Sequence, residues 1–107
     1  MEGEIREEYI IFGYMGDLEE AMRLAKNSGI SGGTIKGIES VHDDLVELGP
    51  LLKSEADYKR LKADLGGLVE GLVKNSREGN EDLILGSVRQ LRDKVRMLKT
   101  VIEKAES

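Results

Sequence analysis

The sequence predicts an all-α protein, an up-and-down antiparallel four-helix bundle, and two observations carry that prediction. Residues 54–105 contain two successive runs of apolar residues at helical spacing, with a short polar break between them. Steps of three and four residues place each run on one stripe of a helix, so this stretch is expected to form a helical hairpin whose stripes need covering. The composition agrees, because 39% hydrophobic, 4% aromatic and 35% charged residues with a single proline are more typical of a bundle than of a sheet. A chain of 107 residues is expected to form one domain, residues 1–107.

Residues 1–28 leave two interpretations open, because their apolar residues fall on two helical faces about a third of a turn apart. One face holds Ile5, Tyr9 and Phe12, and the other holds Ile11, Met15, Leu18, Met22 and Ala25. Gly13 and Gly16 lie where one face gives way to the other. We prefer one long helix kinked at these glycines, because its length of about 25 residues matches the later helices. The alternatives are a short helix followed by a new one capped at Asp17, and a three-helix bundle with a loosely attached N-terminal segment.

The segment after residue 28 predicts a glycine-rich loop and a second helix. Asn27-Ser28-Gly29 is expected to end the first helix, and Thr34 is expected to cap the second. Gly49-Pro50 should kink or end this helix, because proline donates no hydrogen bond and clashes with the preceding turn. The apolar stripe of the second helix comprises Ile35, Ile38, Val41, Leu45, Leu48 and Leu52.

The last two helices have clear start signals. Ser54 and Asp57 form a capping-box pattern for the third helix, which is expected to end near Lys74, and Asn80 is the expected cap of the fourth. The 3-4 repeat of the fourth helix favours the shallow left-handed packing of bundles. The two stripes comprise Tyr58, Leu61, Leu65, Leu68 and Leu72, and then Ile84, Val88, Leu91, Val95, Leu98 and Ile102.

Composition and charge exclude several classes of protein. The chain has no cysteine, which excludes disulfides, thiolate metal sites and thiol nucleophiles. It has no run of about 18 apolar residues and it opens with acidic residues, so we expect no membrane span, no secretory signal and a cytoplasmic location. Few asparagines and glutamines beside many charged residues are compatible with a thermophilic source. The net charge of −5 argues against general nucleic-acid binding, but residues 1–50 carry −7 and residues 51–107 carry +2, so the two halves can attract each other.

The single histidine provides the candidate metal site. Glu39 and His42 lie one helical turn apart, which is the arrangement that di-iron helical bundles use. A complete site needs a second such motif, so it would have to be shared across a homodimer, with further carboxylates from Glu19, Glu20 or Asp43. The competing interpretation is a boundary histidine in an acidic patch. The following Asp43 and Asp44 favour that interpretation, and they also argue against a phosphotransfer histidine because they would repel a phosphoryl group.

No cofactor is predicted. The glycine-rich segment over residues 28–37 resembles a phosphate-binding loop in composition alone, since neither the Walker spacing nor the dinucleotide-binding spacing is met.

Two charged patterns point to surface interactions instead. We call one the basic ridge, which repeats at steps of three and four along the fourth helix and consists of Arg89, Arg92, Arg96 and Lys99. We call the other the acidic ladder, which has a spacing of four on the second helix and consists of Glu39, Asp43 and Glu47. Three interpretations remain open: solvated faces, a complementary seam between elements or subunits, and a phosphate-binding ridge for nucleic acid. Nucleic acid ranks last because the chain is acidic and no aromatic residue lies between the arginines.

The third helix carries a small-residue face, roughly opposite its leucine stripe, that comprises Ala56, Ala63, Gly67 and Gly71, with Gly66 beside it. Each glycine inside a helix costs about 1 kcal/mol relative to alanine. Close approach of a helix from another subunit explains these glycines, and a merely tolerated surface is the alternative. The sequence thus predicts a non-enzymatic bundle that acts through its surfaces as a homo-oligomer or a protein-binding adaptor, with the dimer-shared metal site as the alternative function.

Overall fold

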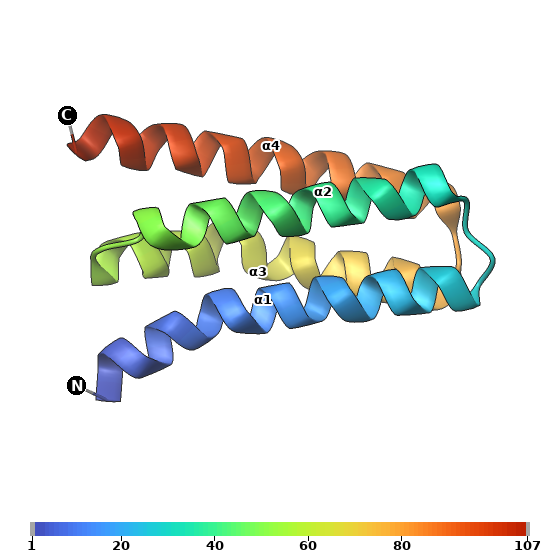
Figure 1. Cartoon of the computed structure of the whole chain (residues 1–107), viewed down its shortest axis with the longest axis horizontal. Helices are drawn as coiled ribbons and strands as arrows, with labels where there is room; N and C mark the ends of the chain where they lie inside the picture. Colours follow the sequence, from blue (N-terminus) through green and yellow to red (C-terminus); the bar gives the residue numbers. More distant parts are fainter. Residues whose placement is uncertain (1, 107) are drawn as a thin grey trace.

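The computed structural model of the chain is a four-helix bundle (Figure 1). Its backbone is described for residues 2–106 and its side chains for residues 10–105. The helices are α1 (Glu2–Asn27), α2 (Gly32–Leu48), α3 (Glu55–Glu78) and α4 (Glu81–Glu106), with a short 3-10 helix η1 (Gly49–Leu51) after α2. Consecutive helices alternate in direction, so the predicted all-α, up-and-down four-helix bundle is confirmed.

The order of the helices around the bundle differs from their order in the chain. Both α1 and α4 pack against α2 and α3, which places α1 diagonally opposite α4 and α2 diagonally opposite α3. As a result, α1 and α3 are parallel neighbours, and so are α2 and α4 (Figure 1). The hairpins α1–α2 and α3–α4 therefore stack side by side, with both of their turns at the same end of the molecule.

The N-terminal segment forms one continuous helix. The α1 backbone stays helical through Gly13 and Gly16, and Asp17 lies in its interior. The expectation of a new helix capped at Asp17 is therefore wrong. The three-helix alternative is wrong as well, because α1 packs against two other helices of the bundle.

One of the two apolar faces predicted for this segment enters the core. Ile11, Leu18 and Ala25 are buried, whereas Phe12 from the other face is 61% exposed. The expected face partners of Phe12, Ile5 and Tyr9, lie outside the residues whose side chains are described.

The boundaries of α2 differ partly from the prediction. Its N-cap residue is Ser31 and not Thr34, which lies inside the helix and is buried. The helix ends at Leu48, and Pro50 lies in the following η1, so the predicted interruption at Gly49-Pro50 is confirmed.

The start of α3 is the predicted capping box. Ser54 Oγ accepts a hydrogen bond from the Asp57 amide at 3.2 Å, and Asp57 Oδ2 accepts one from the Ser54 amide at 3.3 Å. The helix continues to Glu78, beyond the expected end near Lys74.

The turn between α3 and α4 is correspondingly short. Gly79 adopts the left-handed conformation at φ 71° and ends α3 in the manner typical of glycine at this position. The Asn80 side chain accepts a hydrogen bond from the Leu83 amide at 3.2 Å, which confirms Asn80 as the cap of α4.

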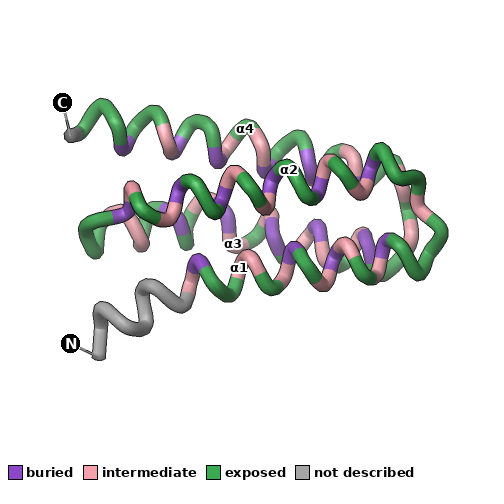
Figure 2. The backbone as a smooth tube through the Cα atoms, viewed as in Figure 1, coloured by how far each residue is buried: buried purple, intermediate pink, exposed green. Residues whose placement is uncertain are grey.

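The core runs the length of the bundle between the two hairpins (Figure 2). The predicted α4 stripe is buried in full, whereas in α3 Leu68 is only half-buried and Val69 takes the inner position. Buried positions in the two hairpins recur 50 residues apart, as in the pairs Ile38 and Val88, Val41 and Leu91, Leu45 and Val95, and Leu48 and Leu98. The two hairpins thus contribute equivalent positions to one core.

Candidate interaction surfaces

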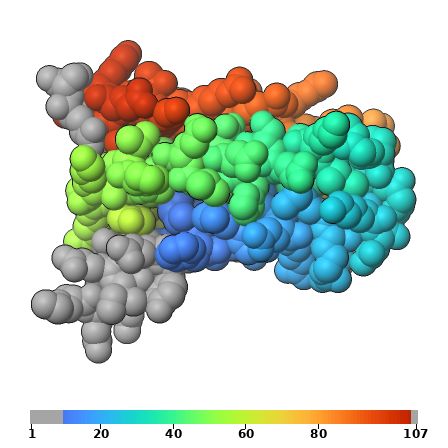
Figure 3. Space-filling view, in the orientation of Figure 1, coloured from blue at the N-terminus to red at the C-terminus, as the bar shows by residue number. Residues whose placement is uncertain are grey.

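The basic ridge and the acidic ladder lie on parallel neighbouring helices, α4 and α2, and they meet where Lys99 contacts Glu47. Side chains of α4 border α2 along the upper side of the molecule in Figure 3. Within the ridge Arg89 and Arg96 are exposed and Arg92 and Lys99 are half-buried, and all three ladder residues are exposed. We call this surface of α2 and α4 the charged face.

Two contacts fix the register of the charged face. A Cβ placed on Gly37 would lie 3.2 Å from Val88 Cγ1, and Lys99 Nζ lies 3.7 Å from Glu47 Oε2. The residue numbers at these two contacts differ by 51 and 52. The ladder residues of α2 therefore lie at about the same heights along the bundle axis as the ridge residues of α4.

The ion pairs of this face, taken over the residues with described side chains, involve few of its charges. The pair between Lys99 and Glu47 involves side chains that are 43% and 66% exposed, and such surface pairs contribute less than about 1 kcal/mol. In the part of the chain with described side chains, Arg89, Arg92 and Arg96 form no ion pair. The sequence predicted these arginines as interaction residues. The fold places their helix, α4, next to the helix that carries the acidic ladder, α2.

Gly67 and Gly71 of the small-residue face have open space beside them in the described part of the structure. A Cβ on either residue would meet no described atom within 4 Å. Gly66 differs, because a Cβ there would lie 3.3 Å from Tyr14 Oη of α1. Packing against α1 therefore accounts for Gly66, whereas packing within the chain does not account for Gly67 and Gly71.

A hollow of about 430 Å³ opens between α1 and α3 beside these glycines, with Tyr14, Asp17, Lys62 and Glu70 among its lining residues. Burial, followed by the charges of Glu20 and Glu70, raises the pKa of Asp17. Burial, followed by the charges of Glu70 and Asp17, also raises the pKa of Tyr14. The carboxylates make this hollow a poor site for an anion.

The proposed metal ligands do not converge within the chain. The His42 side chain is 18% exposed, and its Nε2 lies 3.4 Å from Glu19 Oε1 of α1, while its Nδ1 lies 4.0 Å from Asp43 Oδ1. Glu39 is exposed on α2 and makes no contact with His42 within the ion-pair distance. Over the described side chains, no group of three or more histidine, aspartate or glutamate residues is arranged to hold a metal ion.

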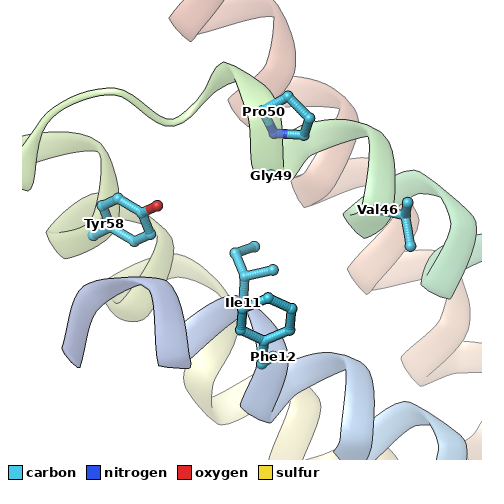
Figure 4. A pocket seen from close by; sticks show the side chains of 6 residues that line it. All are labelled: Ile11, Phe12, Val46, Gly49, Pro50 and Tyr58. Carbon is cyan, nitrogen blue, oxygen red and sulfur yellow. The ribbon is translucent and has the colours of Figure 1, made fainter. Parts of the chain in front are cut away.

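An apolar hollow of about 350 Å³ at the end of the bundle was missed by the reasoning from sequence. Ile11 and Phe12 of α1 face Val46 of α2, Pro50 of η1 and Tyr58 of α3 across an open space (Figure 4). The signal in the sequence was Phe12, which falls outside the core stripe of its helix. The sequence alone does not give the residues that Phe12 faces, because they come from α2, η1 and α3 and depend on how these elements pack against α1.

The glycine-rich loop contacts a carboxylate of the same chain. Glu81 at the start of α4 accepts hydrogen bonds from Ser31 Oγ and from Thr34 Oγ1, the latter at 2.7 Å. These hydrogen bonds lower the pKa of the Glu81 carboxyl, and the one from Ser31 has the largest effect. An anion already lies at the N-terminus of α2, so the phosphate-loop interpretation has no support here.

Among the described residues, no helix is both long and apolar enough to cross a bilayer. Comparison with models of protein families, with curated proteins and with solved structures found no match to this chain.

Proposed function

We propose that this chain is a non-enzymatic protein–protein interaction module that associates with a second copy of itself. The observation that carries the proposal is the charged face, on which a basic ridge and an acidic ladder run side by side at matching heights. Such a surface is complementary to its own copy. Complementary charge on facing surfaces steers association and fixes its register.

The character of the ridge supports this proposal. Arginine is enriched at protein interfaces, where its planar guanidinium binds carboxylates through paired hydrogen bonds. Arg89 and Arg96 are both exposed on α4. Their guanidinium groups are therefore accessible to the carboxylates of a second copy.

The test is the oligomeric state of untagged protein, measured by sedimentation velocity at low and at high salt. We expect a dimer at low salt that dissociates as salt is added, because ions screen exposed charges over about 10 Å at 0.1 M. A chain that remains monomeric at every concentration and at low salt would contradict the proposal.

The small-residue face provides the competing surface for self-association. Replacing Gly67 and Gly71 by leucine adds bulk at two positions where a Cβ would meet no described atom within 4 Å. We expect association to be unchanged in this variant, since the charged face lies on other helices. Loss of the dimer would show instead that α3 forms the contact.

The dimer-shared metal site at Glu39 and His42 is the alternative function, and it is tested on the same sample. Metal analysis of the untagged dimer should find no stoichiometric iron, manganese or zinc if the charged face alone holds the copies together. Bound metal that is lost in His42→Ala together with the dimer would support the metal hypothesis.

A further inference from the structure

We infer that the second copy docks face to face on α2 and α4, about a two-fold axis that runs parallel to the helices. This inference rests on the proposed self-association and adds to it the partner surface and the symmetry. It follows from the charge order on the charged face and from the parallel arrangement of α2 and α4.

Two face-to-face arrangements of identical copies are available, because a two-fold axis in the plane of the interface runs either along the helices or across them. An axis along the helices places α2 of one copy over α4 of its partner, with both helices pointing the same way. An axis across the helices places α2 over α2 and α4 over α4, with opposite directions. These two dimers bury the same surfaces and differ in which charges meet.

The charges select the first arrangement. With the axis along the helices, the acidic ladder of each copy lies on the basic ridge of the other. With the axis across them, carboxylates face carboxylates and arginines face arginines, and such like-charge contacts cost several kcal/mol across an interface.

The heights of the side chains also suit this arrangement, because a two-fold axis along the helices leaves height unchanged. Glu39 and Asp43 of one copy then lie level with the segment 89–96 of the partner, by the register that the contacts of Gly37 and Glu47 set within the chain. Asp93 is exposed within the ridge and carries the opposite charge to it. Replacing Asp93 by asparagine should therefore strengthen the dimer.

The first test reverses charges at exposed positions that form no ion pair with a described lysine or arginine. One variant carries Glu39→Arg and Asp43→Arg, and the other carries Arg89→Glu and Arg96→Glu. We expect each to raise the dissociation constant about tenfold or more, because four contacts become repulsive across the two-fold axis. The two variants change the net charge in opposite directions, so overall repulsion cannot explain a loss in both.

The combined variant with all four reversals decides the outcome. It reverses two residues of the ladder and two of the ridge on every copy, so these residues again face opposite charges and the dimer should return to near the original affinity. A matched control, Lys62→Glu with Lys74→Glu, changes two exposed cations of α3 and should leave the affinity unchanged. Failure of the combined variant to recover, with circular dichroism showing that it is folded, overturns the inference.

The second test uses the absence of native cysteine. Ser40 is exposed and lies two helical turns before Glu47, on the side of α2 that turns toward α4 and hence toward the proposed axis. Ser40→Cys should form a disulfide-linked dimer under mild oxidation, whereas Ala63→Cys on α3 should not. Linkage through Ala63→Cys alone overturns the inference but leaves self-association standing, and a monomeric parent chain overturns the proposed function itself.

Discussion

At the scale of single residues, Glu81 joins the two hairpins at their turns. Its carboxylate accepts hydrogen bonds from Ser31 and Thr34, which lie at the start of the other hairpin's second helix. Thr34 is 3% exposed, so the contact also satisfies a buried hydroxyl. A negative charge at this point suits the N-terminal end of α2, where backbone amides are free.

We predict that Glu81 makes stability depend on pH in the acidic range. Its pKa is lowered from 4.5 by the hydrogen bonds of the folded state, so its contribution is complete above about pH 4.5 and is lost as pH falls through the lower folded value. The difference in unfolding free energy between the parent chain and Glu81→Gln should therefore shrink on acidification. Denaturant unfolding at a series of pH values measures it.

The control for this prediction is Asp82→Asn, which removes one charge from the same helical turn at an exposed position. We expect its difference from the parent to change less across the same pH range, because no hydrogen bond is formed by the Asp82 side chain in the described structure. A difference for Glu81→Gln that stays constant on acidification would contradict the role of its hydrogen bonds.

At the scale of the elements, the glycines have different roles. Gly79 ends α3 in a left-handed conformation, and a Cβ there would also lie 3.1 Å from Ser28 of the neighbouring turn. Gly67 lies in the middle of α3 with open space around it. The same residue type is thus required by geometry at one end of α3 and is not required by the monomer in its middle.

We predict opposite effects for alanine at these two positions. Gly67→Ala should stabilise the monomer by about 0.5–1 kcal/mol, because it removes a residue that weakens a helix interior. Gly79→Ala should destabilise it by about 1–2 kcal/mol, the usual cost of a left-handed conformation for a residue with a side chain. Denaturant unfolding measures both, and effects of the same sign would refute the assignment of these roles.

At the scale of the whole molecule, the two hairpins share one core and contribute equivalent residues to it. Leu48 and Leu98 are buried to 0% and 1% exposure at positions 50 residues apart in the chain. Because α1 packs in parallel on α3 and α2 packs in parallel on α4, equivalent positions of the two hairpins lie close together along the bundle axis. Neither hairpin can bury its apolar stripes alone.

We predict that Leu48→Ala and Leu98→Ala destabilise the protein to a similar extent, by about 2–5 kcal/mol each, because both leave a cavity in the same core. Met97→Ala, at a 46% exposed position next to Leu98, should change stability by no more than about 0.5 kcal/mol. Thermal or denaturant unfolding followed by circular dichroism measures all three. A cost at either leucine as small as that at Met97 would argue against a shared core.

The sequence by itself determined the helices, most of their ends and the buried stripe of α4. Apolar periodicity and capping act between residues within about four positions, so the capping box at Ser54, the cap at Asn80 and the break at Pro50 could be read locally. The basic ridge and the acidic ladder were visible for the same reason. A boundary that depends on a distant contact was predicted wrongly at Thr34, which lies inside α2 and whose hydroxyl donates a hydrogen bond to Glu81 of the other hairpin.

Only the tertiary structure decided how the helices are arranged around the core. Local spacing shows which face of a helix is apolar, but not which other helix covers it, and the crossing from α2 to α3 places α4 next to α2. That arrangement puts the ladder beside the ridge, sets Gly66 against Tyr14 and assembles the apolar hollow from three helices. The charged face belongs to two segments that are about 50 residues apart in sequence, and packing alone made them one surface.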